Sequence, residues 1–216
     1  MVLIALLAVL VVAGCGDDDS NSDGGARTAA QSGERCARVE APEPKPDGGA
    51  SRPKAKLDPA KANEVTFETS CGDFTVTLDV EGAPNTTASF ASLARSGFYD
   101  GTVFHRIVPG FVIQGGDPTG TGTGGPGYKT VDRPPATATY TRGVVSMAKT
   151  AAEKPGTAGS QFYVVTAPDA GLPPEYAIVG EVTAGMDAVE RIEALGTPNE
   201  QPSRPVVIEK ATVGAS

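Results

Sequence analysis

The residues best suited to chemistry gather between positions 104 and 128. This stretch contains the chain's single histidine, His105, followed directly by Arg106. Two short apolar runs come next, divided by Pro109–Gly110, and the second run ends at Gln114. A Pro-Gly pair between apolar runs is typical of a turn that joins two strands. A cation, an imidazole and an amide this close together predict a binding or catalytic site at strand ends.

Two other kinds of site are not predicted. The glycine-rich loop TGTGTGG over residues 119–125 is similar to a phosphate cradle, but it lacks the Lys-Ser/Thr pair and the following helix that a P-loop needs. One histidine and three widely spaced cysteines offer no set of metal ligands. We therefore expect no nucleotide, no metal and no other cofactor.

Short segments of alternating polarity must position these residues. The stretch 65–80 alternates on both sides of a turn at 71–73 and predicts a hairpin with one buried face. Two amphipathic segments, Asn85–Ser96 and Met186–Leu195, predict helices. Further strands are predicted at Thr102–Val108, Phe111–Gln114, Gly143–Met147, Phe162–Thr166, Ala177–Val182 and Val206–Val213. Many short strands with two helices favour a mainly β fold, a closed antiparallel barrel with helical caps.

Composition and charge limit the choice of partners. The chain of 216 residues contains 27 Gly and 18 Pro and has a formal net charge of -8. Because so acidic a chain repels phosphate backbones, we expect no nucleic-acid partner. Regular periodicity begins near Asn63, so we place the folded domain at residues 63–214.

The N-terminal segment predicts export. Val2–Ala13 is an apolar run with the length of a signal-peptide core, which is short for a bilayer span. It ends in Gly14 and Cys15, a pattern that resembles the lipobox of bacterial lipoproteins. The resemblance implies removal of residues 1–14, lipidation of Cys15 and lasting membrane attachment. The alternative is an ordinary secretory signal with an incidental cysteine.

Residues 15–62 show neither a helical nor a strand period. Their Asp, Ser, Gly, Pro and Ala residues bury too little apolar surface to fold, so we expect a disordered tether between membrane and domain. Once Cys15 is lipidated, Cys36 and Cys71 remain as an even pair outside the cytoplasm. Two alternatives are open, a disulfide that pins the tether to the domain or two free thiols.

Four segments, in this order, resemble the cyclophilins, the peptidyl-prolyl cis-trans isomerase family. They are FHRIVPGFVIQGGD, GVVSMAK, GSQFYVVTA and LPPEYAIVGEV, and the resemblance runs from about Asn63 to Val213. It implies a closed eight-stranded antiparallel β-barrel capped by two α-helices, with the substrate groove on the outer surface. It also implies that the partners are unfolded or partly folded proline-containing polypeptides.

The reaction that the resemblance implies needs no covalent intermediate. Rotation about an Xaa-Pro bond breaks amide resonance, at a barrier of about 18–20 kcal/mol, but it makes and cleaves no bond. A donor aimed at the proline nitrogen stabilises the twisted state, and by the family pattern Arg106 is that donor. Gln114 would hold a substrate backbone group, and Phe111 would form part of an apolar slot for the proline ring.

The other matching positions imply a binding groove. They are Val112, Tyr163, Leu172 and, in support, Phe162 at the slot, Ala148 and Lys149 at a strand edge that pairs with the substrate, Gln161 as a groove-lining amide, and Tyr176 near the groove edge. His105 has two interpretations, an acid–base group or a hydrogen-bonded orienting group. Rotation moves no net proton, which favours the orienting role.

The resulting prediction is an exported, lipid-anchored, monomeric isomerase that assists protein folding outside the cytoplasm. The alternative is a non-catalytic module that grips proline-containing segments as a chaperone or scaffold. The presence of Arg106 favours the enzyme, because binding alone does not need a donor at the proline nitrogen.

Overall fold

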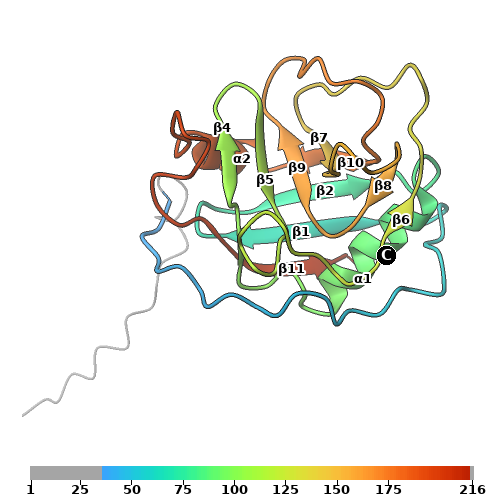
Figure 1. Cartoon of the computed structure of the whole chain (residues 1–216), viewed down its shortest axis with the longest axis horizontal. Coiled ribbons are helices and arrows are strands. Elements are labelled where there is room, and N and C mark those ends of the chain that lie inside the picture. The colour runs from blue at the N-terminus through green and yellow to red at the C-terminus, as the bar shows by residue number, and fades with distance from the viewer. Residues whose placement is uncertain (1–35, 215–216) are drawn as a thin grey trace, which may run out of the picture.

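The computed structural model describes residues 36–214, which form a mainly β domain with two helices (Figure 1). The predicted signal peptide, the lipidation site Cys15 and the tether up to residue 35 lie outside the described residues. The elements are β1 (Glu64–Thr69), β2 (Phe74–Leu78), α1 (Pro84–Arg95), β3 (Thr102–Val103), β4 (Arg106–Val108), β5 (Val112–Gly115), β6 (Thr130–Val131), β7 (Val144–Met147), β8 (Thr157–Ala158), β9 (Phe162–Val165), β10 (Ile178–Ala184), α2 (Met186–Glu193) and β11 (Val207–Val213).

Nine strands form one antiparallel sheet that curls around the core. Their order is β3-β11-β1-β2-β10-β7-β9-β5-β4, while β6 and β8 form a separate pair. Every second residue of β1 and β2 is buried, as the alternating sequence predicts. The inward ring of Phe67 lies 5.1 Å from the centroids of both Phe74 and Phe162. Aromatic side chains from opposite parts of the sheet thus meet in one core.

The structure corrects the predicted barrel in strand number and in closure. The sheet has nine strands instead of eight, and within residues 36–214 its end strands β3 and β4 do not pair with each other. The predicted strand Thr102–Val108 is interrupted at residues 104–105, so β3 pairs with β11 and β4 pairs with β5. The side chain of Phe104, at this interruption, is fully buried in the core. The chain itself, and not a hydrogen-bonded ladder, connects the two ends of the sheet.

Both predicted helices are present, with ends within two residues of those expected. Pro84 stands at the start of α1, where a missing N–H costs nothing. The Asp132 carboxylate accepts hydrogen bonds from the Asn85 and Thr86 N–H groups at 2.9 and 2.6 Å, which caps the helix from a distant loop. Among the described residues, no helix has the length and apolar character needed to span a membrane.

Residues 36–62 contain no helix or strand, yet they lie along the domain. In Figure 1 this segment (blue) follows the lower edge of the domain from the side of α2 to the side of α1. A disulfide joins Cys36 to Cys71, and the Ala37 N–H donates to the Ser70 carbonyl at 2.6 Å. We name residues 36–62 the strap. It differs from the free tether that its composition predicts, because the disulfide, hydrogen bonds and the packing of Ala50 and Leu57 against the core attach it to the domain.

Candidate functional site

Strand register brings three predicted residues side by side. Arg106 on β4 is paired with Gln114 on β5, and Gln114 is paired with Tyr163 on β9. Opposite residues on adjacent antiparallel strands point to the same face, about 5 Å apart. Ile107 and Ile113, the alternate residues, are fully buried in the core. A guanidinium, an amide and a phenol therefore line the outer face of the sheet.

The turn between β4 and β5 places Phe111. Gly110 at the centre of this turn has φ 71°, a conformation that favours glycine. The Phe111 N–H donates to the Val108 carbonyl at 3.0 Å, and the Phe111 carbonyl accepts from the Thr166 N–H at 2.9 Å. Backbone bonds on both sides thus fix Phe111 at the start of β5.

An apolar slot of about 130 Å³ opens between these residues. It is far smaller than a pocket for a drug-sized ligand, and its volume suits one small ring. The slot is lined by Arg106, Phe111, Val112, Gln114, Ala148, Lys149, Tyr163, Leu172 and Tyr176. The structure therefore gathers in one cavity every residue that was expected at the slot, with the exception of Phe162.

Arg106 is held from two sides. Its Nε donates to Glu200 Oε2 at 2.7 Å, and its Nη1 donates to Gln114 Oε1 at 3.4 Å. These bonds use two of the five guanidinium N–H groups, which leaves donors for a ligand in the slot. Glu200 has φ 62°, a left-handed conformation that is uncommon for a residue with a side chain. Backbone strain of this kind concentrates at functional sites.

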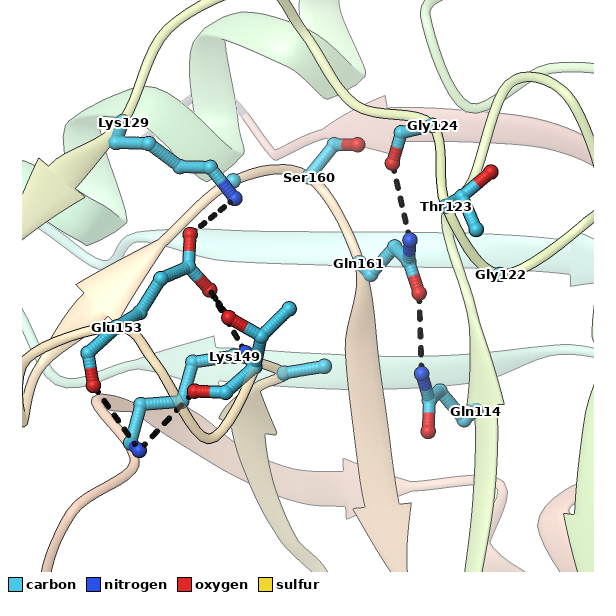
Figure 2. Close-up of a pocket in the computed structure, with 12 residues that line it drawn as sticks. Gln114, Gly122, Thr123, Gly124, Lys129, Lys149, Glu153, Ser160 and Gln161 are labelled. Atoms are coloured by element: carbon cyan, nitrogen blue, oxygen red, sulfur yellow. Dashed lines mark hydrogen bonds and ion pairs between the residues drawn. The ribbon is translucent and has the colours of Figure 1, made fainter.

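A chain of amide groups leads from Gln114 into a second pocket. In Figure 2, Gln114 Nε2 donates to Gln161 Oε1 at 3.0 Å, and Gln161 Nε2 donates to the Gly124 carbonyl at 2.9 Å. The second pocket, about 240 Å³, shares Gln114, Ala148 and Lys149 with the slot. We name it the amide pocket. Gln161 lines this pocket and connects the slot to the glycine-rich loop.

Ala148 and Lys149 follow β7 and form a wall common to both pockets. The Ala148 N–H donates to the Gln161 carbonyl at 2.9 Å, so this donor is used within the protein and is not open to a substrate backbone. The Lys149 side chain is only 3% exposed and its Nζ pairs with Glu175 at 2.9 Å. The same Nζ lies 5.3 Å from the ring centroid of Tyr176, within cation–π range.

Tyr140 supports the far side of the slot. It is fully buried, and its hydroxyl donates to the Tyr176 carbonyl at 2.8 Å while it accepts from the Tyr176 N–H at 3.0 Å. The Tyr176 ring meets the Tyr163 ring edge to face, with centroids 5.8 Å apart. Burial raises the pKa of the Tyr163 phenol, which stays neutral. Within residues 36–214, the Arg106–Glu200 and Lys149–Glu175 pairs thus place charged groups beside the slot, and the Tyr163 phenol is neutral.

His105 does not line the slot. A Cβ built on Gly122 would lie 3.5 Å from the His105 ring, which places the imidazole against the glycine-rich loop. Within the described part of the chain, neither ring nitrogen has a partner at full hydrogen-bond geometry. Burial lowers the pKa of His105 and the Arg106 charge adds to this, whereas the Asp117 charge and a contact with the Val103 backbone oppose it. The orienting role of His105 stays a prediction, and the structure places the imidazole behind the loop instead of in the slot.

Phe162 also lies away from the slot. It is fully buried, and its ring meets those of Phe90 and Tyr99 edge to face at 5.4 and 5.7 Å. Successive residues of a strand point to opposite faces, so Phe162 enters the core whereas Tyr163 lines the slot.

Residues 36–214 contain no cluster of three or more His, Cys, Asp or Glu side chains suited to a metal ion.

Two residues of the site have no signal in the sequence pattern. Glu200 lies in a loop without periodicity, 94 positions from Arg106. Tyr140 is an isolated aromatic residue in another loop. Only the folded arrangement shows that these residues hold Arg106 and Tyr176.

Comparison with known proteins agrees with this geometry. The family model described as "Cyclophilin type peptidyl-prolyl cis-trans isomerase/CLD" matches residues 64–213. Peptidyl-prolyl cis-trans isomerase-like 1 of Emericella nidulans is 43% identical over 157 residues, which cover 70% of this chain and 95% of the relative. Peptidyl-prolyl cis-trans isomerase CYP18-2 of Arabidopsis thaliana is 41% identical over 155 residues, which cover 69% and 93% of the two chains.

Solved structures give the same result. A cyclophilin type peptidyl-prolyl cis-trans isomerase of Cryptosporidium parvum matches with a TM-score of 0.66 and 33% identity, over 72% of this chain and 99% of that chain. The structure of that protein in the presence of the dipeptide Ala-Pro matches with a TM-score of 0.65 and 32% identity, over 71% and 99% of the two chains. The chain therefore belongs to the cyclophilin-type peptidyl-prolyl cis-trans isomerase family.

Proposed function

We propose that this chain isomerises Xaa-Pro bonds in unfolded or partly folded proteins outside the cytoplasm. The observation that carries the proposal is the position of the Arg106 guanidinium at an apolar slot of about 130 Å³, the size of one small ring. The family membership supports the activity. The Ala-Pro dipeptide in the Cryptosporidium structure supports a proline-containing ligand.

The arrangement of groups explains how rotation would be accelerated. The proline ring enters the slot between Phe111 and Tyr163, which restrains one side of the amide. As the bond twists, the proline nitrogen gains a lone pair that a remaining N–H of Arg106 can donate to. Either planar isomer lacks this lone pair, so the interaction is stronger in the twisted state and lowers the barrier.

The proposal is tested with Arg106→Ala in the full-length chain, by NMR exchange on a short Xaa-Pro peptide. By comparison with the loss of one oxyanion-hole donor, we expect kcat to fall by about 100- to 1000-fold while peptide binding persists. Arg95→Ala, in the exposed last turn of α1, is the matched control and should keep wild-type activity.

The non-catalytic alternative predicts a different result. If the wild-type chain binds the peptide but exchange remains at the uncatalysed rate, the protein is a proline-binding module. The roles given to Arg106 and Gln114 in catalysis would then be withdrawn.

We also propose that the chain is an exported, lipid-anchored monomer. The apolar run before Cys15 supports export, and the Cys36–Cys71 disulfide supports an oxidising compartment. Expression with a labelled fatty acid should label the wild-type chain and not Cys15→Ser, which should leave the membrane fraction. Equal labelling of both chains, or a dimer by light scattering, would contradict this proposal.

A further inference from the structure

We infer that the strap positions the catalytic groove, with Asp47 acting on the glycine-rich loop as a positioning residue. The inference rests on the proposed isomerase function. The family match begins at residue 64, so the strap, residues 36–62, lies outside the part of the chain that the family shares. A role for this segment must come from its contacts in the structure.

The strap bonds to the second half of the glycine-rich loop. Asp47 Oδ1 accepts from the Gly125 N–H at 2.8 Å, and the Gly48 N–H donates to the Gly125 carbonyl at 2.9 Å. The Ala50 N–H donates to the Pro126 carbonyl at 3.1 Å. Both backbone polar groups of Gly125 therefore bond to the strap.

Glycines allow the two backbones to come this close. A Cβ built on Gly127 would lie 3.2 Å from the Gly48 Cα, closer than ordinary van der Waals contact. Gly48 and Gly127 have φ of 78° and 89°, which favour glycine as well. A side chain at Gly127 would press on the strap backbone, and the conformations of both residues would be strained by any side chain.

One peptide group connects this contact to the catalytic groove. The Gly124 carbonyl and the Gly125 N–H belong to the same planar unit. The N–H of this unit donates to Asp47, while its carbonyl accepts from Gln161 Nε2 at 2.9 Å. A carboxylate on the N–H side fixes the plane and polarises the carbonyl toward Gln161.

From Gln161 the connection reaches the catalytic arginine. Gln161 Oε1 accepts from Gln114 Nε2 at 3.0 Å, and Gln114 Oε1 accepts from Arg106 Nη1 at 3.4 Å. Each amide uses its oxygen and its nitrogen in the same chain of bonds, so a rotation of one amide disturbs the next. A change in the 124–125 peptide plane is therefore passed to the groups that face the slot.

The buried Asp117 holds the part of the glycine-rich loop that the strap does not contact. The buried Asp117 carboxylate accepts from the N–H groups of Thr119, Gly122 and Gly124 at 2.8, 2.5 and 3.2 Å. These bonds end at Gly124, and the next peptide group, at Gly125, bonds to the strap. The tip of the loop thus has an internal support on one side and the strap on the other.

Lys45 holds the strap in the position that Asp47 needs. Its Nζ donates to the Gly97 and Phe98 carbonyls at 3.1 and 3.0 Å, and its N–H donates to the Pro118 carbonyl at 2.8 Å. The strap is therefore fixed to the end of α1 and to the start of the loop just before Asp47.

The test uses three variants of the full-length chain, each with a substitution at an exposed residue. Their isomerase activity is measured by NMR exchange on an Xaa-Pro peptide. Asp47→Ala should lower kcat/KM by about three- to tenfold, mainly through kcat, the size expected for the loss of one ordinary hydrogen bond at an exposed residue. Asp47→Asn keeps an oxygen acceptor and should retain most of the activity. Asp58→Ala is the matched control, since the Asp58 carboxylate accepts from Ala60 within the strap, and it should match wild type.

A second readout does not depend on turnover. The Gly125 amide hydrogen should exchange faster in Asp47→Ala, and the side-chain amide resonances of Gln161 should move, with an unchanged melting temperature. Equal kcat/KM and equal Gln161 resonances in Asp47→Ala and wild type would overturn the inference. An inactive wild-type chain would overturn the proposed function alone, because the Gln161 and Gly125 signals would still decide the role of the strap.

Discussion

Glu200 holds the Arg106 guanidinium in its orientation, so removal of the Glu200 charge should lower isomerase activity without abolishing it. Glu200 Oε2 lies 2.7 Å from Arg106 Nε, and the two side chains are 52% and 34% exposed. Exposed ion pairs contribute about 0.2–1 kcal/mol, because solvent screens the charges. If all of this energy serves to orient the guanidinium, its loss corresponds to a fall of about 1.4- to fivefold in kcat/KM.

The assay compares Glu200→Gln with wild type by NMR exchange, at low and high salt. We expect a fall of about 1.4- to fivefold in kcat/KM at about 0.1 M salt, and a smaller difference at 1 M, where the Debye length is about 3 Å. Glu190→Gln is the matched control. It breaks a similarly exposed pair with Arg142, away from the slot, and should leave activity unchanged.

A double-mutant cycle decides whether Glu200 acts through Arg106. In an Arg106→Ala background, Glu200→Gln should have no further effect on exchange, because the group it positions is gone. The reasoning would be refuted if Glu200→Gln lowered kcat/KM as much in the Arg106→Ala background as it does in wild type. It would also be refuted if Glu200→Gln alone lowered kcat/KM as much as Arg106→Ala does. The first result would give Glu200 an independent role, and the second would make it a direct participant.

Two further predictions concern stability. Burial lowers the pKa of His105, so between about pH 6.5 and its lower folded pKa the unfolded chain binds a proton that the folded chain does not. The unfolding free energy of wild type should therefore fall as pH drops from 7.5 to 5, and urea titrations of His105→Asn should show a flatter profile; parallel profiles would contradict this. The Cys36–Cys71 disulfide closes a separation of 35 residues, so Cys36→Ser with Cys71→Ala should lose about 3–4 kcal/mol of unfolding free energy in urea. A loss below about 0.5 kcal/mol would show that the strap detaches without affecting the domain.

Periodicity predicted most of the fold because the buried face of each long element is regular. The alternation around Phe67 and Phe74 and the helical spacing around Val189 and Ile192 correspond to buried side chains in the structure. The split of the predicted strand Thr102–Val108 into β3 and β4 was not predictable from periodicity. The stretch Thr102–Val108 contains no Gly or Pro that would divide it, and only pairing with β11 on one side and β5 on the other reveals the interruption at residues 104–105.

The centre of the site was predictable, whereas its supports were not. Arg106, Gln114 and Phe111 lie within nine positions of one another, so a short motif is enough to bring them together. Glu200 reaches the slot only through long-range contacts. The Cys36–Cys71 disulfide of the strap was one of the two alternatives that the sequence left open. The rest of the strap's course was not predictable, because it depends on backbone bonds to loops, which leave no period in the sequence.

The interruption at residues 104–105 has a consequence for the order in which the site is completed. The Phe104 N–H donates to the Val206 carbonyl and the Ile107 N–H donates to the Glu200 carbonyl, so residues 200–206 bond to the chain on both sides of His105. Glu200 emerges 94 residues after Arg106. At ribosomal speeds of about 5–20 residues per second, Arg106 waits roughly 5–20 s for its partner. A nascent chain thus gains its oriented guanidinium only after residue 200 has been synthesised.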